Sequence, residues 1–393
     1  MSAITAKASR KMKKYAVLTR EPRCFLGSFD FSWEQRKLGE LVDVCSGRDY
    51  KHLSEGTIPV YGTGGYMLSV NDALSYDRDA IGIGRKGTID RPYILKAPFW
   101  TVDTLFYAIP REKVDLNYAF DIFQNIDWKK KDESTGVPSL SKTAINDIDV
   151  LAPKHDEQQI IGQFFAAIDN LITLHQRKCV FLFGFFQALI SMIFTASTFS
   201  WEQRKLTEFV EFFSGLTYTP NDVQENGTLV LRSSNVSNGE VVDADNVYVN
   251  PQVVNSENVK VGDIVVVVRN GSRSLIGKHA QIKAFMPNTV IGAFMTGIRS
   301  ECPEFTNALL NTSRFEEEVA MNMGATINQI TGYMFSKMEF KVPCLDEQKK
   351  IGEYFEKLDR LVTLHQRKFE KLTNVKKSML EKMFPQNGSS YPE

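Results

Sequence analysis

The sequence is poor in cysteine and has no net charge. Five cysteines are scattered through 393 residues, with no CxxC pair and no histidine at the spacing of a zinc site. This pattern predicts no bound metal and favours a reducing cytoplasm. The 47 basic and 47 acidic residues cancel, so the overall positive charge typical of many nucleic-acid-binding proteins is absent. Residues 1–30 form a locally basic arm, which fits either a solvated tail or a contact to DNA phosphates.

Long apolar runs are also scarce. No apolar signal core follows the basic amino terminus, so we expect no secretion. Residues 180–196 are an uncharged, mostly apolar run of 17 residues, at the lower limit for a transmembrane helix. Their duplicate, residues 369–386, carries six charged residues, and two copies of one helix should lie in the same solvent. We therefore predict that protein covers the apolar run and that the chain does not enter a membrane.

Catalytic motifs are missing. The sequence has no GxxxxGK[ST] phosphate loop and no Asn/Asp-Pro-Pro-aromatic signature of an adenine methyltransferase. Residues 82–87 match the GxGxxG pattern, but Pro92 would break the helix that must follow in a dinucleotide site. The five histidines form no nucleophile–base pair. We predict no catalytic residue, no metal and no cofactor in this chain.

A duplicated frame dominates what is present. Residues 156–178 and 346–368 are identical at 14 of 23 positions, at a constant offset of 190, and FSWEQRKL occurs at both 31–38 and 199–206. The segments between these repeats differ in length and sequence. A frame that is kept while its inserts diverge indicates two readers of different targets on one scaffold.

The repeated blocks have a seven-residue apolar period. Ile161, Ile168 and His175 recur every seven residues in the first copy, and Ile351, Leu358 and His365 do so in the second. This predicts two long coiled-coil helices, which we expect to pair antiparallel with His175 near His365, since duplicated halves tend to be related by a two-fold axis. The predicted seam and partner-binding residues are Ile161, Phe165, Ile168, Leu171, His175, Ile351, Phe355, Leu358, Leu361 and His365.

Each insert has short β-prone runs separated by glycine-rich turns. The apolar run at 264–268 predicts a strand buried on both faces, and 307–319 is expected to be helical. The predicted fold is therefore mixed α/β, with two globular domains separated by two long antiparallel helices. The predicted boundaries are a basic arm at 1–30, recognition domains at 31–150 and 199–342, coiled-coil helices at 151–198 and 343–385, and a tail at 386–393.

The two inserts share one motif. Arg85-Lys-Gly-Thr88 corresponds to Arg269-Asn-Gly-Ser272, and each follows a predicted buried strand. Arginine can bind guanine bidentately, asparagine can bind adenine, and hydroxyls can hold phosphates, whereas a polar hairpin turn would explain these residues equally well. With the flexible, aromatic-flanked stretch at 61–66 and the polar stretch at 232–237, the candidate DNA-binding residues are Tyr61, Thr63, Gly64, Gly65, Arg85, Lys86, Thr88, Arg232, Ser233, Asn235, Arg269, Asn270, Ser272, Arg273 and Lys278.

Taken together, these features resemble the DNA-specificity subunit of type I restriction–modification systems. The resemblance rests on both copies of WEQRKL, both copies of the proline–EQ–helix block that ends in LHQRK, and the stretches GRKGT, PFWTVDTLF and GDIVVVVRNGSRSLIGK. It covers residues 31–385. The uncharged run at 180–196 departs from the charged pattern of the second copy.

The resemblance implies a non-catalytic subunit that reads a bipartite site in double-stranded DNA. It also implies partners, namely type I methyltransferase subunits docked on the helices and restriction/translocase subunits. S-adenosylmethionine, ATP and magnesium would then be bound by those partners. The alternative from another class of function is a coiled-coil adaptor whose two inserts bind proteins.

Overall fold

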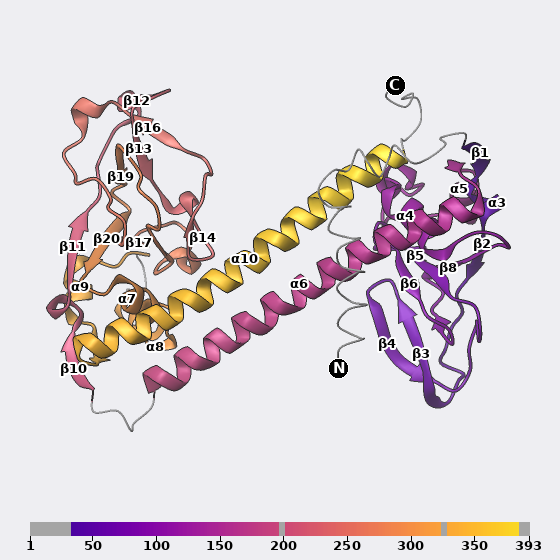
Figure 1. Ribbon diagram of the computed structural model, residues 1–393, viewed down its shortest axis with the longest axis horizontal. Coiled ribbons are helices and arrows are strands. Elements are labelled where there is room, and N and C mark those ends of the chain that lie inside the picture. Colours follow the sequence, from indigo (N-terminus) through magenta and orange to yellow (C-terminus); the bar gives the residue numbers. More distant parts are fainter. Residues whose placement is uncertain (1–32, 196–200, 324–327, 385–393) are drawn as a thin grey trace, which may run out of the picture. The chain divides into compact units, whose positions relative to one another are not determined.

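The computed structural model describes residues 33–195, 201–323 and 328–384 (Figure 1). The predicted basic arm at 1–30 and the tail at 386–393 lie outside these ranges. The chain forms two compact units, residues 1–174 with 368–393, and residues 175–367. Both units mix helices with sheets, so the predicted α/β class is confirmed.

The first unit contains three sheets, with strand orders β2-β8-β5-β6, β4-β3-β7 and β1-β9. The buried strand β5 lies between β8 and β6, and it carries Ile81 and Ile83 into the core. The elements of the first half of the chain are β1 (Glu34–Lys37), α3 (Leu38–Leu41), β2 (Val42–Ser46), β3 (Glu55–Gly62), β4 (Gly65–Val70), β5 (Ala80–Gly84), β6 (Tyr93–Leu95), β7 (Trp100–Thr101), β8 (Leu105–Pro110), α4 (Leu116–Asn125), η1 (Trp128–Lys131), α5 (Lys142–Asn146), β9 (Asp149–Ala152) and α6 (His155–Thr195).

The second unit repeats the main sheet as β11-β20-β17-β18, with further sheets β12-β16-β13-β19, β14-β15 and β10-β21. Strand β17 is buried along its whole length, which confirms the predicted buried strand. The elements are β10 (Glu202–Lys205), η2 (Leu206–Glu208), β11 (Val210–Ser214), η3 (Pro220–Asp222), β12 (Val223–Gln224), β13 (Thr228–Leu231), η4 (Ser233–Asn235), β14 (Val236–Ser237), β15 (Glu240–Val241), β16 (Val247–Val249), η5 (Pro251–Val253), β17 (Ile264–Val267), η6 (Arg273–Leu275), β18 (His279–Gln281), β19 (Thr289–Ile291), β20 (Met295–Ser300), α7 (Pro303–Leu310), α8 (Ser313–Asn322), α9 (Gly332–Lys337), β21 (Glu339–Val342) and α10 (Leu345–Met383).

The helical structure predicted at 307–319 is present, but it is divided between two helices, because α7 ends at Leu310 and α8 begins at Ser313. Thr312 lies between them, where its hydroxyl donates to Leu309 O and accepts from the Phe315 amide. A threonine that caps a new helix in this way ends the helix before it, since its side chain competes for the backbone groups.

The duplicated letters make duplicated contacts. Strands β1 and β9 pair in the same antiparallel register as β10 and β21, with EQRK in the first strand of each pair. The indole of Trp33 donates to Glu157 at 3.0 Å, and that of Trp201 donates to Glu347 at 3.2 Å. The WEQRKL repeat therefore fastens each domain to the first turn of a long helix.

The helices α6 and α10 have 41 and 39 residues. In the second unit they run antiparallel, because His175 contacts His365 while Phe186, farther along α6, contacts Phe355, earlier in α10. The Nδ1 atoms of the two histidines are 2.8 Å apart, so the predicted approach of His175 and His365 is confirmed. One ring must donate this hydrogen bond and the other must accept it.

The structure changes which of two adjacent apolar positions in each heptad is buried. Leu171 and Leu361 are 39% and 43% exposed, so the prediction that they lie in the seam is wrong. The buried position is the one that directly follows in the sequence: Val362, the residue after Leu361, is only 8% exposed. Phe165 and Phe355, which occupy this same later position, are buried as predicted. Apolar residues at both neighbouring positions made the period ambiguous, and packing against each domain selects the later one.

Candidate nucleic-acid interface

Arg85 and Arg269 each follow the buried central strand of their domain, but they differ by one residue in register, because Lys86 makes the bridge to Ser139 that corresponds to the bridge from Arg269 to Gln329. Arg85 follows β5 and its backbone amide donates to Thr104 O at 2.8 Å, while the amide of Arg269, after β17, donates to Phe294 O at 3.2 Å. Each guanidinium lies over a ring at the start of the neighbouring strand, 5.7 Å from the centroid of Phe106 and 5.1 Å from that of Phe294. Both arginines are exposed. The stacking orients an exposed cation without neutralising it.

A second segment supports each arginine loop. Lys86 forms an isolated antiparallel bridge with Ser139, and Arg269 does so with Gln329. In the first domain the Gly87 amide also donates to Pro138 O at 2.9 Å. Gly87 has φ +89° and open space where a side chain would lie, so the turn is free to approach a ligand closely. Thr88 is half-buried at the end of this turn.

The second domain brings two predicted stretches together. Asn270 donates from its side chain to the Ser233 hydroxyl at 2.9 Å, which joins the loop after β17 to the loop after β13. Asn270 also accepts from the amide of Ser272, whose hydroxyl lies 2.9 Å from that of Ser274. The result is a braced polar loop with Arg269 and Arg273 exposed beside it.

Asn235 has a different role from the one predicted. Its side chain is 1% exposed and bonds to the Arg232 amide, to Ala244 O and to Asn246. A side chain that is buried and saturated in this way holds the 242–246 loop, so we exclude it from the interface. Arg232 is likewise occupied, because its guanidinium donates to the Asp245 backbone and carboxylate, both at 2.6 Å.

Tyr61, Thr63, Gly64 and Gly65 lie on a separate hairpin. Gly62 pairs with Gly65, so Thr63 and Gly64 form the turn between β3 and β4, and Gly65 has φ +105°. Tyr66 is 63% exposed and meets Tyr61 edge to face. Among the described residues, no hydrogen bond or ring contact connects this turn with the Arg85 loop. The hairpin is thus an exposed aromatic element that is separate from the Arg85 loop.

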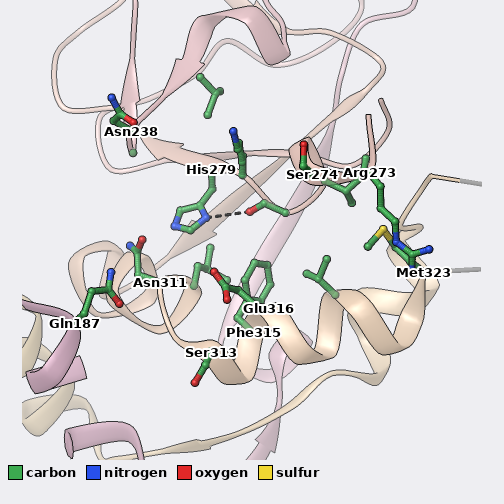
Figure 2. Close-up of a pocket in the computed structure, with 17 residues that line it drawn as sticks. Gln187, Asn238, Arg273, Ser274, His279, Asn311, Ser313, Phe315, Glu316 and Met323 are labelled. Atoms are coloured by element: carbon green, nitrogen blue, oxygen red, sulfur yellow. Dashed lines mark hydrogen bonds between the residues drawn. The ribbon is translucent and has the colours of Figure 1, made fainter. Parts of the chain in front are cut away.

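Arg273 and Lys278 line a cavity of about 530 Å³ between the β18 region and α8 (Figure 2). Its wall includes His279, whose Nδ1 lies 3.1 Å from Gly277 O. Burial lowers the pKa of His279, so the ring is neutral near pH 7 and its Nδ1 donates to that carbonyl. Gly277 has φ +85°, and a side chain there would crowd Val319. The basic loop therefore forms part of the cavity wall through Arg273 and Lys278.

Sequence reasoning missed the two rings and one amide that support the loops. Phe106 and Phe294 orient the arginines, and Asn328 donates to Gly271 O at 3.0 Å. An aromatic residue near the start of the strand that pairs with each arginine strand was the available signal. Over residues 33–195, 201–323 and 328–384, no group of three or more metal-binding side chains gathers.

The helix α6 carries an exposed apolar face. By length and composition it is the one helix in the described ranges that could cross a membrane. Phe181 and Phe185 stack at 6.2 Å with their rings nearly parallel, and Phe181 is 70% exposed. The opposite face packs on protein, since Ile190 is 2% exposed against Ala308 and Phe355. One-sided burial of this kind indicates a surface helix with an interaction face.

Comparison with known proteins identifies the class. The family model described as the type I restriction modification DNA specificity domain matches residues 32–179 and 200–374. The chain therefore belongs to the type I restriction–modification DNA-specificity family. Both matched segments contain one WEQRKL repeat, one recognition domain and most of one long helix.

Particular relatives are similar to the chain over part of its length. It is 24% identical over 276 residues to the type I restriction enzyme MjaVIII specificity subunit of Methanocaldococcus jannaschii, covering 64% of this chain and 65% of the relative. It is 27% identical over 172 residues to the StySPI specificity subunit of Salmonella potsdam, covering 41% of this chain and 36% of the relative. The chain thus matches less than two thirds of the length of each.

One solved structure supports the fold over nearly the whole chain. The type I restriction–modification S subunit from M. genitalium has a TM-score of 0.71, with 14% sequence identity, over 91% of this chain and 98% of that chain. At this identity the likeness concerns the fold alone.

Proposed function

We propose that this chain is the non-catalytic, DNA-reading subunit of a type I restriction–modification complex. Its two domains each read one half of a bipartite site in double-stranded DNA. The observation that carries the proposal is that each domain has an exposed arginine just past the end of its buried central strand, Arg85 in the first and Arg269 in the second, and that each guanidinium lies over a phenylalanine ring. Family membership supports the same function.

The chemistry of the two loops differs in a way that suits two different half-sites. The first loop offers Arg85, Lys86 and Thr88, which can bind a guanine edge and phosphates. The second offers Arg269 and a polar group at Asn270, braced by Ser233. The further candidates in the second domain are Ser272, Arg273 and Lys278, and those in the first are Tyr61, Thr63, Gly64 and Gly65.

The partners follow from the exposed helix face and from the lack of catalytic motifs. The apolar stripe of α6 around Phe181 and Phe185 is a surface on which a methyltransferase subunit would bury apolar area. Restriction/translocase subunits complete the complex. S-adenosylmethionine, ATP and magnesium are bound by these partners, and the complex works in the cytoplasm without a membrane.

Methylation mapping tests the proposal. The chain is co-expressed with its methyltransferase partner, and methylated bases are mapped genome-wide. Arg269→Ala should weaken binding of the specific duplex by about 1–3 kcal/mol and relax one half of the motif, because a bidentate base contact is lost. Arg85→Ala should relax the other half.

Two controls separate base contacts from general charge. Lys260→Ala removes an exposed lysine of the second domain that lies 4.0 Å from Glu257, and it should leave the motif intact. Arg269→Lys keeps the charge but loses the planar fork, so it should behave like the alanine variant in specificity. If the wild-type complex shows no salt-dependent retention of duplex DNA, the adaptor alternative replaces this proposal.

A further inference from the structure

A buried charge cluster fastens the first recognition domain to the ends of both helices. Lys376 of α10 is a seam residue with a side chain only 8% exposed. Its ammonium lies 2.6 Å from both carboxylate oxygens of Asp169 on α6 and 2.5 Å from Oε1 of Gln124 on α4. An ammonium has three hydrogens to donate, and the helix and the domain share them.

A second carboxyl group lies beside this cluster. Asp121, one turn before Gln124 on α4, is 1% exposed, and its Oδ2 has no hydrogen-bond partner among the described residues. Burial raises the pKa of Asp121 well above its ordinary value, while the charge of Lys376 opposes that rise. Lys376 is therefore a buried cation next to one buried carboxyl group, Asp121, and one partly exposed carboxyl group, Asp169.

The duplication shows which residues take these places in the second unit. The helix offset of 190 relates Lys376 to Phe186 and Asp169 to Asp359. For the domains, Gly162 approaches the amide of Tyr118 just as Gly352 approaches that of Phe305, and both aromatic residues are fully buried. This offset of 187 relates Asp121 to Ala308 and Gln124 to Asn311.

The second unit builds the same junction from apolar groups. Phe186 packs edge to face on Phe355, with ring centroids 5.3 Å apart, in one cluster with Ala308. Asp359 lines a small cavity beside Phe186 and Ala308, and its carboxylate pairs with Lys283 at 2.5 Å. The positions that hold a cation and its acceptors in one unit hold a ring and a methyl group in the other.

Exchanging one side of either junction would be costly. A phenylalanine at 376 would leave Asp169 without its cation, and a lysine at 186 would lose the ring contact with Phe355 and face Ala308, beside an Asp359 carboxylate that already pairs with Lys283. A buried charge whose partner is removed is strongly destabilising, and deliberate mismatches of this kind specify pairing between similar elements.

We propose that Lys376 and Phe186 match each helix end to its own recognition domain. The first domain is accepted only with polar acceptors at positions 121 and 124, and the second only with a small apolar residue at position 308. These residue requirements, which we call the junction code, limit which recognition domain can be attached at each of the two junctions. The code concerns the junctions alone and holds whether or not the chain binds DNA.

A rescue experiment on the full chain tests the code. Lys376→Phe should lower the melting temperature by on the order of 10 °C, with faster amide exchange in α4 and in residues 368–384. Adding Asp121→Ala and Gln124→Asn, the residues of the second domain, should recover at least half of the loss. Lys376→Met serves in the same scheme if the phenylalanine variant does not fold.

The reciprocal arm builds the charged junction in the second unit. Phe186→Lys should be destabilising, and adding Ala308→Asp should recover part of the loss, because the introduced carboxylate and that of Asp359 then give the new lysine two acceptors. Lys377→Phe, at the exposed neighbouring position, is the control and should change the melting temperature little. Purely additive effects in both arms, with no rescue, would overturn the proposal.

Discussion

The two recognition domains share one sheet order but fill one position with opposite sizes. In the first unit Cys45 of β2 lies opposite Tyr107 of β8, and in the second Phe213 of β11 lies opposite Gly297 of β20. The large residue has moved to the other strand. In both pairs a large residue lies opposite a small one although the residues differ, and cores tolerate divergence of this kind.

The same comparison separates the contacts that both units share from the packing residues that differ between them. The frame residues, such as Trp33 and Trp201, make the same hydrogen bonds in both units. The packing residues differ, as the junctions at Lys376 and Phe186 show. Two domains can therefore diverge toward different targets while each stays attached to its helix by the same few contacts.

The largest effect is expected where a side chain is added to the small residue of the pair formed by Phe213 and Gly297. In Gly297→Ala the new Cβ would lie 2.0 Å from the ring of Phe213, which is also held under Arg299 at 4.9 Å. We expect a loss of up to about 3 kcal/mol in the free energy of unfolding, measured by urea titration. Phe213→Cys, the residue of the first unit, should rescue much of it. A neutral Gly297→Ala would show that the ring is not held in place.

An intermediate effect sharpens the contrast between the junctions. Burial raises the folded-state pKa of Asp121, so above the unfolded pKa of about 3.9 the unfolded chain gains from ionisation and the folded one does not. The stability contributed by Asp121 therefore falls as pH rises from about 4 to the folded pKa.

Asp121→Asn should accordingly match wild type below about pH 4 and become the more stable protein as pH rises. Each unit of pKa difference is worth about 1.4 kcal/mol. Urea unfolding at pH 4.5 and 7.5 measures the change. Asp169→Asn is the matched control and should be destabilising at neutral pH, because Lys376 loses its partner. A constant advantage of Asp121→Asn at every pH would contradict the assignment.

The smallest effect tests whether the frame is equal in both units. Trp33→Phe and Trp201→Phe each remove one indole hydrogen bond to a glutamate. Each should cost about 1 kcal/mol, the net contribution of a typical hydrogen bond. Thermal unfolding with amide exchange reports each unit separately. A large loss from only one tryptophan would show that the frame is stronger on one side.

Much of the fold could be predicted from local pattern. The duplication, the long helices, the approach of His175 to His365 and the buried strand β17 all follow from repeats and periodicity. The break between the two helices at 307–319 could not be predicted, because Thr312 is recognised as a helix cap only from its contacts. The domain boundaries and the DNA-contact residues stay predictions.

The candidate site was less predictable. That Arg85 and Arg269 both follow the central strand could be read from the motifs, but their predicted correspondence is wrong by one residue, because strand pairing places Arg269 at the position of Lys86. That Asn235 is buried and Arg232 is paired with Asp245 could not, since both belong to a loop whose closure depends on residues 242–246. The sequence does not distinguish a polar residue that faces solvent after a strand from one that holds a neighbouring loop.

The sequence alone determined the plan of this protein, namely two copies of a frame, two different inserts, helices with a seven-residue period and no catalytic motif. Those properties are local or repetitive, so they are visible in one dimension. The tertiary structure decided which of two adjacent apolar positions enters the seam, which arginine remains exposed, and that Lys376 is buried against Asp169 and Gln124. Burial is a property of what packs against a residue, and distant segments of the chain supply those neighbours.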